Sequence, residues 1–290
     1  MSISRSGALV VLALLPGCSK PAQQPAAAPV AALFGGGEAG RPAPRVSPPA
    51  EGERLFAALC ASCHGADGKG DTPLAADLDP TPSDLTRCNF KLRSTPSGSL
   101  PTDDDLLRSL YVGLPGSAMP SFGDVLSLPA LRALVLRVKA RCERFAEEQA
   151  GEPLAVLDAT GAAGASRERG AAVYRREGCA SCHGTDGAGD GPASAKLKDS
   201  QGRPIRPRDH TRGVFRGGFR AADIYRGFST GLDGTPMPAL PEGVGARDRW
   251  DLTRYIFSLG ARRSRLLRVM EQPPTWYEPA LSRRPPWHGK

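Results

Sequence analysis

The pattern Cys-x-x-Cys-His occurs twice in this 290-residue chain, and its residue types and spacing can hold a porphyrin. The two copies are formed by Cys60, Cys63 and His64 and, 119 residues later, by Cys179, Cys182 and His183. Two thiols three residues apart on a helical turn can form thioethers with both vinyl groups of one porphyrin, and the adjacent histidine then lies below the iron. The sequence therefore predicts two covalently bound haem c groups.

Two other uses of paired cysteines fit this pattern less well. A structural zinc site needs four ligands, and one histidine beside each cysteine pair leaves each site short of that number. A thioredoxin-like cysteine pair lies in a βαβ context, and no segment of this sequence shows the alternation of a strand.

Methionines at equivalent places after the two motifs could supply a second axial ligand. Besides Met1 the chain has three methionines, and two of them, Met119 and Met237, precede a proline. Met119 follows His64 by 55 residues, and Met237 follows His183 by 54. A lone methionine usually fills a gap in a core, but the shared position and proline favour His/Met ligation at both irons. Because thioether ligation favours reduced iron, we expect six-coordinate haems of positive potential.

The likeness between the two copies extends well beyond the motifs. Gly52 and Phe56 upstream of the first motif match Gly170 and Tyr174 upstream of the second, and similar Asp/Gly-rich segments follow both. A period of 119 residues is too long for a solenoid repeat, so it indicates a duplicated domain.

Apolar spacing predicts three helices in each copy and no strand. The first helix covers residues 51–60 or 166–179, and a short helix starts near residues 103–105 or 222–223. The last helix is predicted by helical spacing of apolar residues, namely Leu131, Leu134, Val135 and Val138 in the first copy and Leu252, Tyr255, Ile256 and Leu259 in the second. The predicted fold class is all-α.

Both halves resemble class I cytochrome c domains, which carry Cys-x-x-Cys-His after the first helix and Met-Pro in a loop before the last helix. The resemblance covers residues 49–145 and 166–262. It implies two tandem cytochrome c domains, each about three helices wrapped round a covalent haem. It also implies that the first and last helices of each domain cross near Gly52 and near Gly170.

Two cysteines lie outside the motifs. Cys88 and Cys142 have no counterparts in the second copy, where Gly213 and Ala261 stand instead. In an oxidising compartment a disulfide is the simplest use of two such cysteines, and two buried free thiols are the alternative. A disulfide would join the loop beneath the haem to the last helix and stabilise the domain by roughly 2–4 kcal/mol.

The N-terminal residues resemble an export signal. Arg5 is the only charged residue before an apolar run at residues 7–15, which is too short to span a bilayer. The run leads to Leu-Pro-Gly-Cys, which is similar to a bacterial lipobox, so Cys18 is a candidate for lipidation. Pro16 and the single positive charge are atypical of such signals, and an unlipidated cleaved signal or a misassigned start are the alternatives.

Composition completes the expected domain order. The stretch after Cys18 is rich in proline and alanine, as in a tether. We expect a signal peptide (1–17), the lipid-anchor cysteine with its linker (18–48), a first cytochrome c domain (49–150), a linker (151–165), a second cytochrome c domain (166–265) and a basic proline-rich tail (266–290).

The net charge of +8 does not by itself indicate nucleic-acid binding, because no basic helix with interleaved aromatic residues accompanies it. His210 lies in a basic loop and is expected to be a solvated loop histidine rather than a ligand. Candidates for contacts with haem propionates are Arg87, Lys91, Arg212 and Arg216, which occupy matching loop positions in the two copies.

These features predict an electron carrier rather than an enzyme. The protein would pass single electrons between a respiratory donor and a partner oxidase, reductase or dehydrogenase on the periplasmic side of a bacterial membrane. The alternative is a haem enzyme, such as a di-haem peroxidase or a thiosulfate-oxidising cytochrome. A peroxidase needs a vacant or easily vacated position on iron, and a Met-Pro in both domains argues against one.

Overall fold

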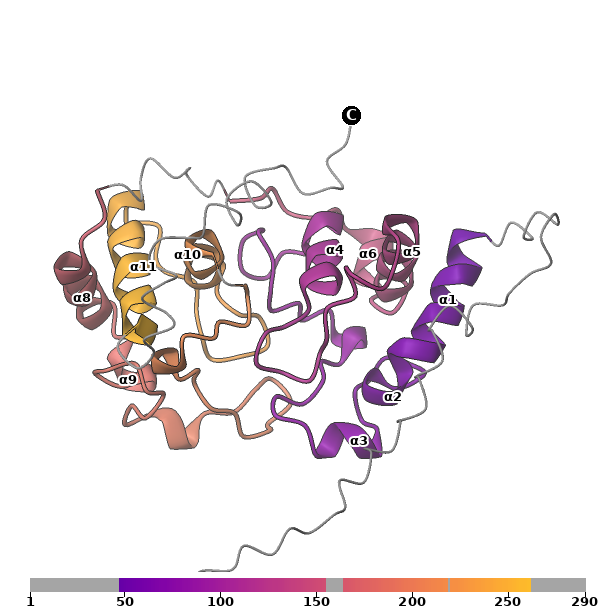
Figure 1. The fold of residues 1–290 in the computed structure, drawn as a ribbon, viewed down its shortest axis with the longest axis horizontal. Helices are drawn as coiled ribbons and strands as arrows, with labels where there is room; N and C mark the ends of the chain where they lie inside the picture. The colour runs from indigo at the N-terminus through magenta and orange to yellow at the C-terminus, as the bar shows by residue number, and fades with distance from the viewer. Residues whose placement is uncertain (1–46, 155–163, 219, 262–290) are drawn as a thin grey trace, which may run out of the picture. The chain divides into compact units, whose positions relative to one another are not determined.

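The computed structural model describes residues 47–154, 164–218 and 220–261 (Figure 1). The described residues belong to one compact unit, Val46–Lys290. They form helices and loops without a strand, apart from a single isolated bridge between Lys198 and Pro204. The all-α class is confirmed. The predicted signal peptide, Cys18, nearly all of the first linker and the basic tail lie outside the described residues.

The first half contains two long helices that sit next to each other and several shorter ones (Figure 1). In chain order they are α1 (Pro48–Leu59), α2 (Ala61–His64), α3 (Pro73–Ala76), the 3-10 turn η2 (Leu85–Arg87), α4 (Asp103–Val112), α5 (Leu128–Lys139) and α6 (Arg144–Glu147). The predicted first helix therefore starts earlier than expected, because Pro48 suits the first turn of a helix. The haem motif forms its own short helix.

The second half repeats this order. Its helices are α8 (Arg167–Arg176), α9 (Ala180–His183), the 3-10 turns η3 (Ser194–Lys196) and η4 (His210–Arg212), α10 (Ala221–Thr230) and α11 (Ala246–Ala261). The predicted helix at 166–179 is broken, because the chain leaves the helix at Glu177 and Gly178 takes a φ of 72°. Glycine adopts this left-handed conformation without steric cost.

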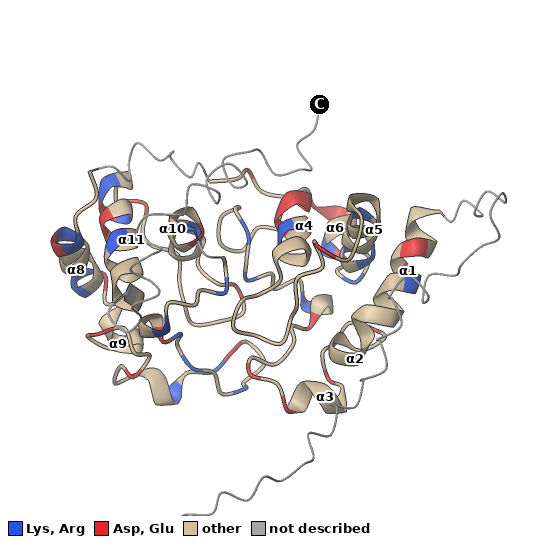
Figure 2. Ribbon diagram, viewed as in Figure 1, with Lys and Arg blue, Asp and Glu red and all other residues tan. Residues whose placement is uncertain are grey.

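The start of α4 is fixed by a capping box. The Thr102 side chain accepts a hydrogen bond from the Asp105 N–H at 3.1 Å, and the Asp105 carboxylate accepts one from the Thr102 N–H at 3.1 Å. Figure 2 shows acidic residues at this end of α4, where their charge opposes the positive end of the helix dipole. In α10 the carboxylate of Asp223 likewise accepts from the Arg220 N–H, at 3.1 Å.

The first and last helices of each half cross at a glycine. A Cβ on Gly52 would overlap the carbonyl of Ala133 in α5, and a Cβ on Gly170 would overlap the carbonyl of Asp251 in α11. Only glycine permits so close an approach of two helix backbones. The predicted crossings at these two glycines are confirmed.

Each half packs around its own apolar core. In the first, Leu55 and Phe56 of α1 meet Leu131 and Leu134 of α5, and each of the four is at most 1% exposed. In the second, Tyr174 of α8 packs with residues of α10 and α11, and its hydroxyl donates to the carbonyl of Gly184 at 2.7 Å. Within the described ranges no helix combines the length and the apolar character needed to cross a membrane.

Candidate functional site

The two Cys-x-x-Cys-His motifs adopt the same single helical turn. The N–H of His64 donates to the Cys60 carbonyl at 2.8 Å, and the N–H of His183 donates to the Cys179 carbonyl at 2.9 Å. This turn places the first cysteine and the histidine of each motif on one side of the helix. The following glycine of each motif has a φ of 77°, which ends the turn directly after the histidine.

All four motif cysteines lie at partly buried positions. Burial raises the pKa of Cys60 to about 11 and that of Cys179 to about 11. Both groups are therefore neutral at physiological pH. A buried neutral sulfur suits a thioether, which carries no charge.

Both motif histidines are held through their Nδ1 atoms by backbone carbonyls. His64 Nδ1 lies 3.0 Å from the Ser83 carbonyl, and His183 Nδ1 lies 3.2 Å from the Arg208 carbonyl. Burial lowers the pKa of each imidazole, against the opposing effect of the hydrogen bond, so both rings are neutral. A neutral ring that donates from Nδ1 keeps the lone pair on Nε2, which is the arrangement a metal ligand needs.

Met119 and Met237 end two hairpin loops with the same hydrogen bonds. The N–H of Leu114 donates to the Met119 carbonyl at 3.1 Å, and the N–H of Leu232 donates to the Met237 carbonyl at 3.1 Å. Inside each loop a hydroxyl, from Ser117 or Thr235, donates to the leucine carbonyl at 2.7 Å and accepts from the methionine N–H at 3.2 Å. The two hydroxyls were not singled out from the sequence, although they occupy matching positions.

Each methionine packs against the same core as the cysteine motif of its own half. Cys60 and Met119 contact the first core, and Cys179 and Met237 contact the second. In each half one core therefore contacts both the first motif cysteine and the methionine. Together with the second cysteine and the histidine of the same helical turn, these residues could hold a haem c, the cysteines through thioether bonds and the histidine and methionine as axial ligands.

The charges around these groups also fit a haem, whose propionates are anionic. Arg216 is partly buried, and its buried Nε has no hydrogen-bond partner among the described residues. Burial and the neighbouring charge of Arg203 lower the pKa of Lys91. Buried cations of this kind require an anion nearby. A cavity of about 400 Å³ is lined by four arginines and three aspartates, namely Arg206, Arg208, Arg212, Arg216, Asp79, Asp190 and Asp209.

His210 differs from the expectation of a solvated loop histidine. Its ring stacks on the ring of His183 with centroids 4.5 Å apart, and its Nδ1 atom is buried without a hydrogen-bond partner in the described structure. Burial, followed by the effect of His183, lowers the pKa of His210 to about 3. The equivalent residue in the first half is Leu85, since both make the same backbone hydrogen bond at 2.7 Å, to Gly68 or to Gly187.

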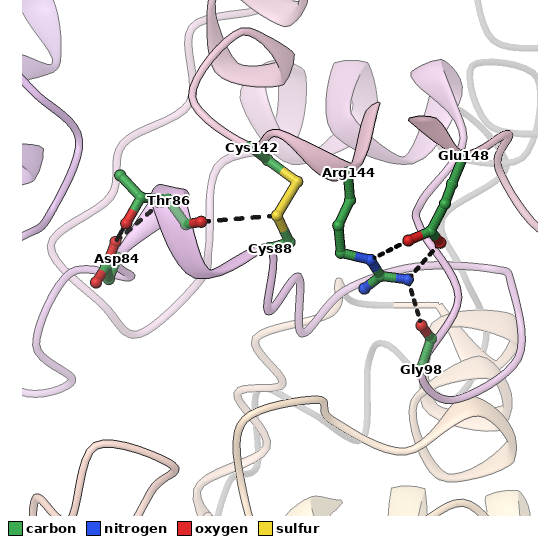
Figure 3. Close-up of a disulfide and its surroundings, with 7 residues drawn as sticks. All are labelled: Asp84, Thr86, Cys88, Gly98, Cys142, Arg144 and Glu148. Carbon is green, nitrogen blue, oxygen red and sulfur yellow. Dashed lines mark hydrogen bonds and ion pairs between the residues drawn. A yellow bond between two sulfur atoms is a disulfide. The ribbon is translucent and has the colours of Figure 1, made fainter. Parts of the chain in front are cut away.

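Cys88 and Cys142 form a disulfide, with their Cα atoms 5.3 Å apart (Figure 3). Both are buried and pack with Leu100, Phe90 and Phe145. Cys142 lies between α5 and α6 rather than within the last long helix, where the sequence had placed it. The helix ends at Lys139. The Ala140 N–H still makes an α-helical bond to Leu136, but the next two N–H groups, of Arg141 and Cys142, make tighter bonds to the carbonyls of Val138 and Lys139.

The chain resembles known cytochromes in both halves. The cytochrome c family model matches residues 167–260. The model for cytochrome c oxidase, cbb3-type, subunit III matches residues 47–136. No curated protein matches the chain.

A solved structure gives a match across both halves. A chain of the Kuenenia stuttgartiensis reducing HAO-like protein complex Kustc0457/Kustc0458 is 37% identical, with a TM-score of 0.67. The match covers 72% of this chain and 95% of that chain. Together with the fold and the repeated site, this match shows that the chain belongs to the class I c-type cytochromes, which carry covalent haem c and transfer electrons. Within that class it is a member with two tandem cytochrome c domains.

Proposed function

We propose that this protein is a di-haem electron carrier with one His/Met-ligated haem c in each domain. The thioether bonds come from Cys60, Cys63, Cys179 and Cys182, and the axial ligands are His64, Met119, His183 and Met237. The observation that carries this proposal is the repeated donor set, in which each motif and its methionine contact one core. Haem iron supplies one-electron redox chemistry when bound.

The chain's own part in this function is to fix the ligands and exclude water. The carbonyls of Ser83 and Arg208 orient the two imidazoles. Closed rings of hydrogen bonds in the two hairpins fix the backbone at each methionine, which limits where each thioether can lie. The apolar cores lower the local dielectric, and thioether ligation together with a dry site favours reduced iron. The same hairpins argue against an enzyme that works through an open iron.

We also propose redox-partner proteins for this carrier. The similar solved chain is part of a HAO-like protein complex, which supports association with a larger oxidoreductase. The resemblance of the N-terminal residues to an export signal, together with the Cys88–Cys142 disulfide, supports a location on the periplasmic side of a membrane, with lipidation at Cys18 as the anchor.

Absorption spectra of the mature protein test this function. We expect a pyridine haemochrome count of two haems per chain, a weak red band from sulfur–iron ligation in the oxidised protein, and no spectral shift of the reduced protein with carbon monoxide. Carbon monoxide binding by one wild-type haem would instead indicate an open iron and an enzyme.

Single variants test the ligand assignment. Met119→Ala and Met237→Ala should each open one haem only to carbon monoxide and lower its potential. If neither variant bound carbon monoxide, the assignment of the two methionines would be wrong.

A further inference from the structure

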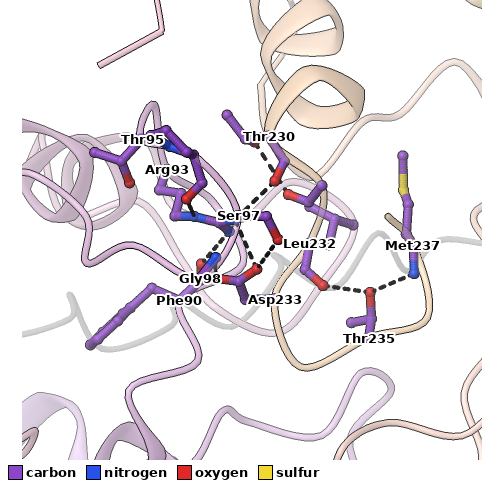
Figure 4. Close-up of polar contacts among 12 residues, drawn as sticks. Phe90, Arg93, Thr95, Ser97, Gly98, Thr230, Leu232, Asp233, Thr235 and Met237 are labelled. Atoms are coloured by element: carbon purple, nitrogen blue, oxygen red, sulfur yellow. Dashed lines mark hydrogen bonds and ion pairs between the residues drawn. The ribbon is translucent and has the colours of Figure 1, made fainter. Parts of the chain in front are cut away.

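The hairpin that carries Met237 is hydrogen-bonded to an arginine of the first domain (Figure 4). The side chain of Arg93, in the loop before α4, is completely buried. Its Nη2 donates to the Asp233 carboxylate at 2.8 Å and to the Thr230 carbonyl at 2.9 Å. Asp233 lies inside the Met237 hairpin, and Thr230 is the last residue of α10, directly before it.

The remaining contacts anchor both partners of this ion pair in the first domain. Arg93 also donates to the carbonyls of Phe90 and Pro96, each at 3.1 Å. Asp233 accepts further hydrogen bonds from the Ser97 hydroxyl at 2.9 Å and from the Gly98 N–H at 3.1 Å. The hairpin is therefore tied to a first-domain loop through one carboxylate and one buried guanidinium.

Among the described residues the hairpin of the first domain has no such ion pair. Pro115 stands where the second domain has Asp233, so that loop offers no carboxylate. Its cross-domain contact is a long hydrogen bond of 3.5 Å from Arg208 to the Gly116 carbonyl. The two hairpins share their internal hydrogen bonds but differ in what holds them from outside.

The free energy of burying the Arg93 guanidinium links the position of the Met237 hairpin to the domain interface. A buried guanidinium is stable only with its acceptors in place, and removal of one partner of a buried ion pair leaves an uncompensated charge. Displacement of the Met237 hairpin would move the Asp233 carboxylate away from Arg93. Separation of the domains would likewise free the hairpin.

We propose that Arg93 and Asp233 are positioning residues for Met237, so that ligation at the second haem depends on docking of the first domain. This inference rests on the proposed role of Met237 as an axial ligand. The first domain thereby controls whether the second iron stays six-coordinate, whereas ligation at the first iron by Met119 lacks an equivalent clamp.

A second cross-domain ion pair provides a matched control. Arg108 donates to Asp223 at 2.6 Å and to the Gly217 carbonyl at 2.7 Å. Asp223 belongs to the first turn of α10, away from the hairpin, and keeps a second partner in Arg226 at 3.3 Å. Loss of the Arg108 pair weakens the interface but leaves the hydrogen bonds between Asp233 and the first domain in place, so this variant shows the effect of weaker docking alone.

The test compares Arg93→Met, Asp233→Asn and Arg108→Met with Met237→Ala in the full-length holoprotein. The readouts are the red sulfur–iron band of the oxidised protein and the carbon monoxide taken up by the reduced protein, with the thermal midpoint measured alongside. Hydrogen bonds to charged groups shift an equilibrium by roughly tenfold or more. We therefore expect the fraction of second haem that binds carbon monoxide to rise at least about tenfold in Arg93→Met and in Asp233→Asn. The upper limit is the one equivalent of carbon monoxide per chain expected for Met237→Ala.

Each outcome decides a separate point. If Arg93→Met and Asp233→Asn took up no more carbon monoxide than Arg108→Met, while Met237→Ala took up one equivalent, the clamp would be refuted and the ligand assignment would stand. If Met237→Ala itself left the spectrum unchanged, the ligand assignment would fail. Asp233→Asn keeps the shape of the side chain, so it answers the question even if Arg93→Met does not fold.

Discussion

Removal of the disulfide between Cys88 and Cys142 should destabilise the protein without changing its haem sites. The bond links residues 54 positions apart. Closing a loop of that length removes chain entropy from the unfolded state equivalent to about 4 kcal/mol. For a unit of this size each kcal/mol shifts the thermal midpoint by about 2–4 °C, so the loss should be roughly 8–16 °C.

The assay is thermal unfolding of the oxidised holoprotein, followed by circular dichroism, for Cys88→Ala, Cys142→Ala and the double variant. Because each variant removes the same bond, all three should lose nearly the same stability rather than adding. The red sulfur–iron band should stay at its wild-type height, since the two cysteines pack in a separate cluster with Leu100.

Two results would refute this reasoning. A fall in the midpoint of less than about 2 °C would mean that the closed loop does not constrain the unfolded chain as the entropy argument requires. Additive losses in the double variant would mean that the two side chains act through separate packing contacts, as two buried free thiols would.

Three further outcomes follow from the second domain. Gly170→Ala should cost about 1–3 kcal/mol in denaturant unfolding, because its Cβ would overlap the backbone of α11; an unchanged midpoint would contradict the tight crossing. Burial opposes ionisation of Asp251, but hydrogen bonds from Arg169 and from a backbone N–H outweigh it and lower its pKa. The stabilisation by the Asp251 carboxylate is therefore present above its unfolded pKa of about 3.9 and is lost as the pH falls through the lower folded pKa. Asp251→Asn should be less stable than wild type at pH 7, and the difference in stability should shrink in acid. His210→Leu, which copies Leu85 of the first domain, should raise the potential of the second haem in a redox titration, because a less polar neighbour disfavours oxidised iron; equal potentials in variant and wild type would show that the stacked ring has no such effect.

Local and repeated features of this protein could be predicted from the sequence. The Cys-x-x-Cys-His turn depends on residues within one helical turn, and the crossings at Gly52 and Gly170 follow from a matched glycine in each copy. Apolar spacing predicted that these segments are helical. It did not predict that the first helix of each copy ends before the haem motif, because a cysteine or glycine there leaves the apolar period unchanged.

Features that depend on tertiary packing could not be predicted in this way. His210 stands among arginines, and its polar neighbours suggested solvent, whereas the packing of the loop places its ring on His183 and within 5.8 Å of the Phe215 ring. Comparison of the two copies shows that Asp233 replaces Pro115 of the first copy, but it does not show which residue Asp233 would bind. That partner, Arg93, is 140 residues away and meets it only because the two domains dock.

The buried Arg93 makes each domain electrostatically incomplete without the other. A first domain alone would hold a buried guanidinium without its ion-pair partner Asp233, and a second domain alone would hold a carboxylate without its three first-domain donors. The two domains therefore form one cooperative unit rather than two independently folding domains, and heat should unfold them in a single transition. Gene duplication supplied two similar domains, and ion pairs from residues outside both motifs make the stability of one depend on the other.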